Sequence, residues 1–278
     1  MSINRKTAVI TGAASGMGEA LSHLCAERGY DLALFDINGE ELDGVARVCR
    51  TKGAKVITRT FDVADEAAAK QAAEQVSQEF RSVTLLFNNA GVALGGMFHH
   101  YETEDYRWLI EINFFGVVHM TRAFLPLVKK AEPRGQIINT SSIFGIIAPI
   151  GQTAYSAAKF AVRGFSEALR HELEGTSVGV TVVYPGGVAT NISKRARMSK
   201  ALPEDFVEEQ QKEFAKKLVM PASRAAQLIL NAAERGDPRL IVGNDARFAA
   251  AIQRFFPTSY WRVFKLVAGD RVPEVPDF

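Results

Sequence analysis

The chain alternates short, continuous apolar runs with longer segments in which apolar residues recur at helical spacing. The short runs are bounded by Gly, Pro or acidic residues, which predicts strands. These predicted strands are 7–11, 32–35, 55–61, 83–87, 136–138, 179–184 and 240–242. The predicted helices are 18–28, 40–52, 67–80, 104–130, 154–174 and 223–235. Apolar strands that alternate with helices predict an α/β fold, with a parallel sheet covered by helices on both faces.

Composition narrows the classes of protein. With 278 residues and 47% hydrophobic content, the chain can bury one large core and remain a single α/β unit. A formal charge of +2 is too balanced to favour nucleic acid as the main partner. Cys25 and Cys49 follow no secretory pattern, so we expect reduced thiols in a cytoplasmic protein. We see no signal peptide, and no apolar run reaches the ~20 residues that span a bilayer.

A glycine-rich loop lies where the first predicted strand turns into the first predicted helix. It runs from Gly12 to Gly18 and contains Gly16, with Ser15 and Met17 on either side of that glycine. Glycines without a Cβ let the backbone turn tightly and approach a pyrophosphate, which then lies at the helix N-terminus. A flexible turn is the alternative. The strand before the loop and the helix after it favour a dinucleotide cofactor bound by these residues.

Asp36 ends the second predicted strand, 18 residues after Gly18. A carboxylate at this place can accept hydrogen bonds from both hydroxyls of the cofactor ribose, and it would repel a 2′-phosphate. No Arg or Lys lies in the glycine loop or next to Asp36 in the sequence, so NAD is favoured over NADP. The alternative is that Asp36 caps the following turn or helix.

The stretch 139–161 carries the candidate chemistry. Ser142 follows a strand, at the edge where open α/β sheets bind their ligands, and Tyr155 comes 13 residues later. Tyr155 and Lys159 are four residues apart and share one helix face. A neighbouring ammonium favours phenolate and lowers a tyrosine pKa that starts at about 10, which would give a general base or acid. An ordinary exposed helix face is the alternative.

Further polar positions lie next to strand ends or in apolar surroundings. The motif NNAG at 88–91, which includes Asn89, Ala90 and Gly91, can hold a ribose and adenine, brace the sheet or form a plain turn. Asn113 lies among apolar residues of the long predicted helix and needs partners, either as a structural amide or at a kink or water near the active site. Pro185, Gly186 and Thr190 form a corner that can line a nicotinamide site.

The remaining segments offer weaker signals. His99 and His100 have no matching ligands at metal-binding spacing, so we expect no metal site. The basic run 191–200 is typical of a solvated loop, and contact with an acidic substrate group or a phosphate is the alternative. Residues 203–218 are charged and helical, and with their flanks they predict a substrate lid at about 190–220.

The pattern of residues 244–278 predicts a C-terminal amphipathic helical extension beyond a main domain of residues 1–243. Aromatic and apolar residues are interleaved there with basic ones, among them Phe248, Phe255, Trp261, Arg254 and Arg262. Packing of this tail on the body or on a partner subunit is favoured, and contact with a membrane surface is the alternative.

Taken together and in this order, these motifs resemble the classical short-chain dehydrogenase/reductase family over about residues 5–243. The motifs are TGxxxGxG at 11–18, NNAG at 88–91, Asn113, Ser142, YxxxK at 155–159 and Pro185–Gly186. The resemblance implies a single Rossmann-type, doubly wound domain with a seven-stranded parallel sheet. It also implies a catalytic tetrad and an assembly as a homodimer or homotetramer. The tetrad would be Asn113, Ser142, Tyr155 and Lys159.

The resemblance further assigns cofactor contacts to residues that the motifs alone do not single out. It implies that Asp62 and Val63 hold the adenine, that Asn89 holds the adjacent ribose, and that Val188 and Thr190 contact the nicotinamide.

We therefore expect an NAD(P)-dependent oxidoreductase that interconverts a secondary alcohol and its ketone. The apolar segment 143–150, with Phe144, Ile146, Ile147 and Ile150, predicts a hydrophobic substrate. Two alternatives remain, a dinucleotide sensor without catalysis and a membrane-surface scaffold that uses the tail.

Overall fold

The computed structural model describes residues 5–192, 195–198, 208–209, 212, 215–216 and 218–268. Its main sheet has seven strands, all parallel, in the order β11-β7-β6-β4-β1-β2-β3. The strands are β1 (Thr7–Thr11), β2 (Asp31–Asp36), β3 (Val56–Thr60), β4 (Leu85–Asn88), β6 (Gly135–Thr140), β7 (Val178–Pro185) and β11 (Arg239–Val242). The predicted doubly wound, parallel α/β fold is confirmed. Much of the predicted lid at 190–220 lies outside the described residues.

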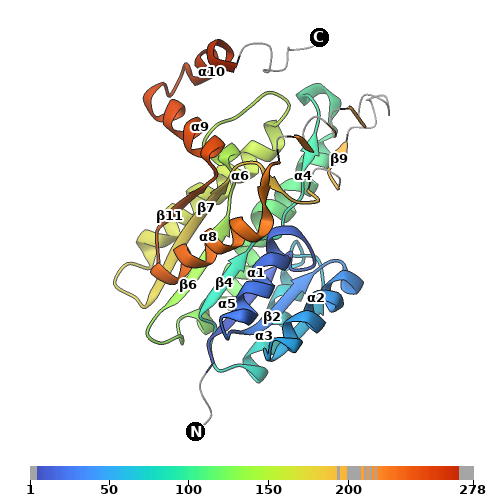
Figure 1. The fold of residues 1–278 in the computed structure, drawn as a ribbon, viewed down its shortest axis with the longest axis vertical. Helices are drawn as coiled ribbons and strands as arrows, with labels where there is room; N and C mark the ends of the chain where they lie inside the picture. Colours follow the sequence, from blue (N-terminus) through green and yellow to red (C-terminus); the bar gives the residue numbers. More distant parts are fainter. Residues whose placement is uncertain are drawn as a thin grey trace.

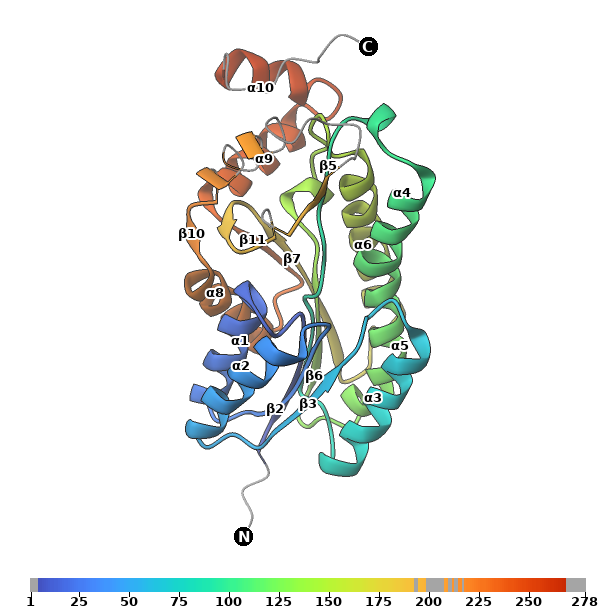
Figure 2. The same cartoon turned by 90° about the vertical axis from the view of Figure 1, so that its right-hand side faces the viewer.

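Helices cover both faces of this sheet, as Figure 2 shows edge-on. One face carries α1 (Gly16–Glu27), α2 (Gly39–Thr51) and α8 (Ala222–Arg235). The other carries α3 (Glu66–Glu79), α4 (Thr103–Ile110), α5 (Gly116–Val128) and α6 (Thr153–Glu172). Alternate residues of each strand enter the two cores, so Ile10 packs on the α1 side and Val9 on the α3 side.

The polar ends of the strands meet at one edge of the sheet. Because every strand runs in the same direction, Thr11, Asp36, Asn88, Thr140 and Pro185 all end their strands there. Short elements extend this edge. They are β5 (Leu94–Gly95), which pairs with β9 (Arg197–Met198), β8 (Val188–Ala189), which pairs with β10 (Met220–Pro221), and the helical turns η1 (Phe98–His100) and η3 (Ile143–Gly145).

Two sequence-based boundaries differ from the structure. The helix predicted at 104–130 consists of α4, a π-helical turn η2 (Glu111–Phe115) and α5. The π turn inserts an extra residue into the helical ladder and turns Asn113 into the protein interior. The helix predicted to begin at Ser223 begins one residue earlier, at Ala222, with Pro221 at the N-cap position.

The C-terminal tail forms α9 (Asn244–Phe255) and α10 (Tyr260–Ala268), which lie beyond the strand ends in Figure 1. One face packs on the body: Ala246 and Ala250 are buried, and the Tyr260 hydroxyl accepts a hydrogen bond from the Ala148 amide at 3.1 Å. The opposite face leaves Phe248 53% and Phe255 74% exposed. No helix in the described part of the chain is long and apolar enough to cross a membrane.

A buried amide network ties the centre of the sheet to α6. The Asn88 side-chain amide donates to Thr121 Oγ1 at 2.9 Å and to Asn139 Oδ1 at 2.8 Å. The Asn139 amide then donates to Ser166 Oγ at 2.9 Å, and Ser166 donates to the Val162 carbonyl. Buried polar groups of this kind stabilise the fold only while each keeps its partner.

We expect Asn139→Ala to lower the free energy of unfolding by about 2–3 kcal/mol, because two buried hydrogen bonds disappear and their partners lose a contact. Urea unfolding followed by circular dichroism measures this change. Gln78→Ala on the exposed face of α3 is the control, with an expected effect of less than about 0.5 kcal/mol. Equal stability of the Asn139 variant and the wild type would contradict the prediction.

Candidate active site

Ser142, Tyr155 and Lys159 come together where β6 ends and α6 begins. Ser142 follows β6 directly, and its side chain lies close enough to the Tyr155 hydroxyl to lower the pKa of that group. Lys159 lies one turn after Tyr155, with its Nζ 5.6 Å from the centre of the tyrosine ring. The same Nζ donates to the Thr140 carbonyl at 3.0 Å. Ser142 and Lys159 are buried, whereas Tyr155 is only partly buried.

The electrostatics of the pair differ from the sequence-based prediction. Burial raises the pKa of Tyr155 to about 12, while the hydrogen bond with Ser142 acts in the opposite direction. Burial also lowers the pKa of Lys159 to about 8. The prediction that Tyr155 has a lowered pKa is therefore wrong for this structure, because desolvation of the phenolate outweighs the stabilising contacts.

Asn113 lies fully buried in the π turn and uses both ends of its amide on one residue. Its Oδ1 accepts from the Val92 amide at 2.8 Å, and its Nδ2 donates to the Val92 carbonyl at 2.9 Å. A Cβ on Gly91 would lie 3.0 Å from Asn113 Oδ1 and 3.5 Å from Lys159 Nζ. Asn113 thus fixes the loop after β4 next to Lys159, from its position in the π turn.

The glycine loop forms a cradle that no larger residue could make. Gly12 and Gly16 have φ angles of +64° and +60°, and a Cβ on Gly18 would overlap the Gly12 carbonyl. Helix α1 begins at Gly16, and Ser15 at its N-cap makes no side-chain capping hydrogen bond, so the first amides of the helix keep no cap of their own. Met17 packs against the core. This arrangement fits a pyrophosphate at the helix N-terminus.

The Asp36 carboxylate caps the turn that follows β2, as the capping alternative predicts, and it also contacts the glycine loop. Its Oδ2 accepts from the Ala14 amide of the glycine loop at 2.9 Å, and its Oδ1 accepts from the Asn38 amide at 3.0 Å. Each carboxylate oxygen has a second acceptor site, so the geometry leaves capacity for ribose hydroxyls.

Asn89 points to the glycine loop. Its Nδ2 donates to the Thr11 carbonyl at 3.1 Å, and Thr11 Oγ1 accepts from the Asn89 and Ala90 amides, each at 3.0 Å. The Asn89 Oδ1 is buried and makes no hydrogen bond within the described part of the chain. The NNAG motif therefore holds the glycine loop against β4, and it presents one polar oxygen that is free for a ligand.

The other predicted cofactor residues lie around the same edge. The Asp62 side chain accepts a hydrogen bond from the Ala64 amide at 2.9 Å. Val63 packs so closely against Gly116 that a Cβ on this glycine would lie 2.7 Å from the Val63 side chain. Val188 is buried in β8. Thr190 lies against the glycine loop, since a Cβ on Gly16 would lie 3.1 Å from the Thr190 side chain.

Asp245 was missed by sequence reasoning. The corner at Pro185 and Gly186 is fixed by Asp245 of α9, whose carboxylate accepts from the Gly187 amide at 2.7 Å. A Cβ on Gly186 would collide with the same carboxylate. Asp245 lies 58 residues along the chain from Gly187, and no spacing rule connects the two.

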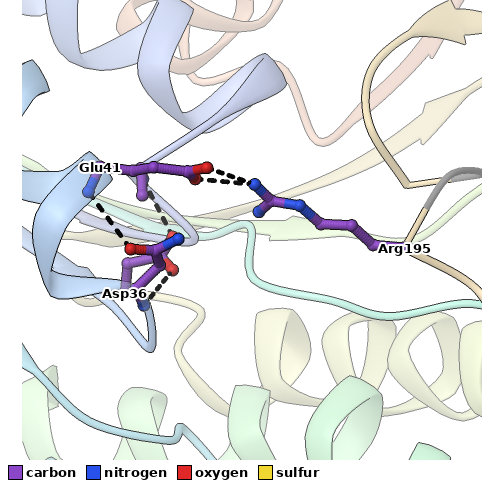
Figure 3. A network of polar contacts seen from close by, with 5 residues as sticks. Asp36, Glu41 and Arg195 are labelled. Atoms are coloured by element: carbon purple, nitrogen blue, oxygen red, sulfur yellow. Dashed lines mark hydrogen bonds and ion pairs between the residues drawn. The ribbon is translucent and has the colours of Figure 1, made fainter.

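The sequence also gave no sign of a basic residue near Asp36. Arg195 approaches from the loop between β8 and β9 and pairs with Glu41 of α2, with its Nη2 2.6 and 2.8 Å from the two carboxylate oxygens. Figure 3 shows Asp36 beside Glu41, with Arg195 approaching Glu41 from the other side of the view. No Arg or Lys lies next to Asp36 along the chain, and in the folded protein Arg195 contacts Glu41 and acts on Asp36 only through its charge.

Comparison with known proteins agrees with this geometry. The family model described as short chain dehydrogenase matches residues 6–201. SadH of Mycobacterium tuberculosis, named as an oxidoreductase, is 39% identical over 94% of this chain and 95% of its own length. The 3-ketodihydrosphingosine reductase of Bacteroides thetaiotaomicron is 36% identical over 69% of this chain and 67% of its own.

A solved structure has the same fold over its entire length. A short-chain dehydrogenase/reductase from Burkholderia phymatum in complex with NAD superposes with a TM-score of 0.84 and 26% identity, covering 100% of both chains. The motifs, their convergence at one sheet edge and these matches lead to one conclusion. The chain belongs to the short-chain dehydrogenase/reductase family, enzymes that act on CH–OH groups.

Proposed function

We propose that this enzyme interconverts a hydrophobic secondary alcohol and its ketone with NAD, using Tyr155 as the general acid/base. The observation that carries the proposal is the contact between the Ser142 hydroxyl and Tyr155, with the Lys159 ammonium one helical turn away. The three groups face a glycine cradle on the same edge of the sheet.

In the proposed reaction, the bound nicotinamide supplies the hydride acceptor for oxidation and the hydride donor for reduction. Ser142 and Tyr155 hold the substrate oxygen between them, and Ser142 orients it as a donor aimed at the charge that develops there. The Tyr155 Oη takes the alcohol proton in oxidation and returns it in reduction. Lys159 would hydrogen-bond the nicotinamide ribose and favour phenolate, and Asn113 would hold a water that connects Lys159 to solvent.

The proposed cofactor contacts follow the edge of the sheet. The glycine loop would hold the pyrophosphate and Asp36 the ribose, while Asp62, Val63 and Asn89 would surround the adenosine. The remaining contacts are Ala90, Gly91, Tyr155, Lys159, Pro185, Gly186, Val188 and Thr190. NAD bound to the similar Burkholderia phymatum protein supports NAD in preference to NADP.

The substrate class is inferred from the apolar surroundings of Tyr155. Phe144 stands edge-on to the Tyr155 ring with centroids 6.1 Å apart, and Leu94 and Val92 pack in the same cluster as Tyr155. Ile146 and Ile147 belong to the buried core against β7 and α9, so they do not serve as open pocket walls. The relative named as a 3-ketodihydrosphingosine reductase supports a ketone on a hydrophobic molecule.

We also propose a homodimer or homotetramer built on the helices that carry Asn113 and Tyr155. Phe115, at the end of the π turn, is 39% exposed, and Phe160 on α6 is 40% exposed. Large apolar side chains exposed on neighbouring helices are typical of contact with another subunit.

Tyr155→Phe removes only the hydroxyl, and we expect it to abolish detectable turnover while NAD binding changes by less than about threefold. Absorbance of reduced nicotinamide on a panel of alcohols measures turnover, and calorimetry measures binding. Near-normal rates in this variant would contradict the acid/base role. NAD binding by the wild type without turnover on the whole panel would favour the sensor.

The raised pKa of Tyr155 predicts the pH dependence. Oxidation needs the phenolate, so its kcat/KM rises with pH between about 6 and 10, whereas reduction needs the phenol, which stays protonated over this range, so the kcat/KM of reduction stays constant there. Ser142→Ala removes a hydrogen bond that lowers the pKa of Tyr155, so the rise of the kcat/KM for oxidation should move to higher pH. An oxidation profile with the same pH dependence in the variant and the wild type would contradict this coupling between Ser142 and Tyr155.

Gly18→Ala tests the cradle. The added Cβ collides with the Gly12 carbonyl, so we expect NAD affinity to fall at least about tenfold. Gly164→Ala is the matched control, because a Cβ at that exposed position of α6 meets nothing within 4 Å. Equal NAD affinity of the two variants, measured by calorimetry, would argue against pyrophosphate binding on this loop.

A further inference from the structure

One guanidinium lies at the adenosine end of the cradle and is not used in the proposed reaction. Arg195 and Glu41 are 154 residues apart in the chain, and one nitrogen of Arg195 contacts both oxygens of Glu41, at 2.6 and 2.8 Å. The two side chains remain 49% and 41% exposed, so the pair faces solvent at the open edge of the sheet.

Glu41 is rigidly connected to the ribose-binding corner. Asp36 Oδ1 accepts from the Asn38 amide, and Asn38 caps α2 by accepting from the Glu41 amide at 3.2 Å. Figure 3 shows these residues as one connected network, with Arg195 reaching it from the opposite side. Glu41 raises the pKa of Arg195 first by hydrogen bonding and then by its charge, and Asp36 adds to the same effect. Arg195 is therefore within electrostatic range of both carboxylates.

The charges at this corner determine which adenosine ribose it accepts. Two carboxylates, Asp36 and Glu41, face one guanidinium, so the corner carries a net negative charge that disfavours a 2′-phosphate. A guanidinium is the side chain best suited to bind phosphate, but Arg195 is committed to Glu41.

We propose that Glu41 is a specificity-determining residue, which keeps the enzyme selective for NAD by occupying Arg195, a latent ligand for the 2′-phosphate of NADP. This inference rests on the proposed cofactor site. Asp36 alone repels the phosphate, whereas Glu41 acts in addition by withholding the cation that would attract it.

Two adenosine fragments test this proposal without turnover. ADP carries the free 2′-hydroxyl, and adenosine 2′,5′-bisphosphate carries the 2′-phosphate. We expect Glu41→Gln to bind the bisphosphate roughly tenfold more tightly than the wild type does in calorimetry, because Arg195 is released to a charge-assisted contact. ADP affinity should stay within about twofold, and the gain should weaken as salt concentration rises.

Two further variants separate the mechanism from a simple loss of negative charge. Glu40→Gln removes the same charge from the neighbouring residue in the first turn of α2, and we expect a gain of no more than about twofold. In Glu41→Gln/Arg195→Gln, the tenfold gain should disappear. NADP-dependent kcat/KM of the four proteins should follow the same order.

The outcomes distinguish this inference from the proposed function. The inference is overturned if ADP binds but Glu41→Gln leaves the bisphosphate affinity unchanged, if Glu40→Gln gains as much, or if the double variant keeps the gain. If the wild type binds neither fragment, the proposed cofactor site is wrong and this inference fails with it.

Discussion

The proposed catalytic arrangement depends on two buried hydrogen bonds that join α6 to the end of β6. Lys159 Nζ donates to the Thr140 carbonyl, and Ser141 Oγ donates to the Lys159 carbonyl at 2.8 Å. Gly145 allows this contact, because a Cβ there would collide with Ser141 Oγ and the Lys159 backbone. Ser142 is covalently next to this link and Tyr155 is one turn away, so both are held in one rigid unit.

The same burial that makes this unit rigid opposes its charged states. It raises the pKa of Tyr155 and lowers that of Lys159, which are both displacements toward neutral forms. Fixed donors compensate for part of this effect, since the Ser142 hydroxyl acts on Tyr155. A site of this type depends on preorganised dipoles and on charges that ligands bring, more than on the lysine alone.

The two ends of the proposed cofactor site are built by different means. At the nicotinamide end, backbone corners and buried side chains fix the geometry, with Asp245 holding Gly187 and Asn113 holding Val92. At the adenosine end, the polar groups are half-exposed, and their selectivity depends on the balance of charges between Asp36, Glu41 and Arg195. Rigid packing therefore supports the chemistry, while adjustable surface electrostatics supports the choice of cofactor.

The sequence by itself determined the strand and helix order, the parallel sheet, the glycine loop and the positions of Ser142, Tyr155 and Lys159. These features depend on local periodicity and on residue types at fixed spacing, which a linear chain displays directly. A kink at Asn113 was one alternative, but its form as a π turn was not predicted, because helical periodicity does not record one extra residue in a hydrogen-bond ladder.

Only the tertiary structure decided which distant groups meet. It brought Arg195 to Glu41 and Asp245 to Gly187, and it placed Ile146 and Ile147 in the core instead of an open pocket. It also reversed the predicted direction of the Tyr155 pKa shift, because desolvation depends on everything packed around a group. Contacts and burial of this kind arise from the folded arrangement of segments far apart in sequence, and no local pattern encodes them.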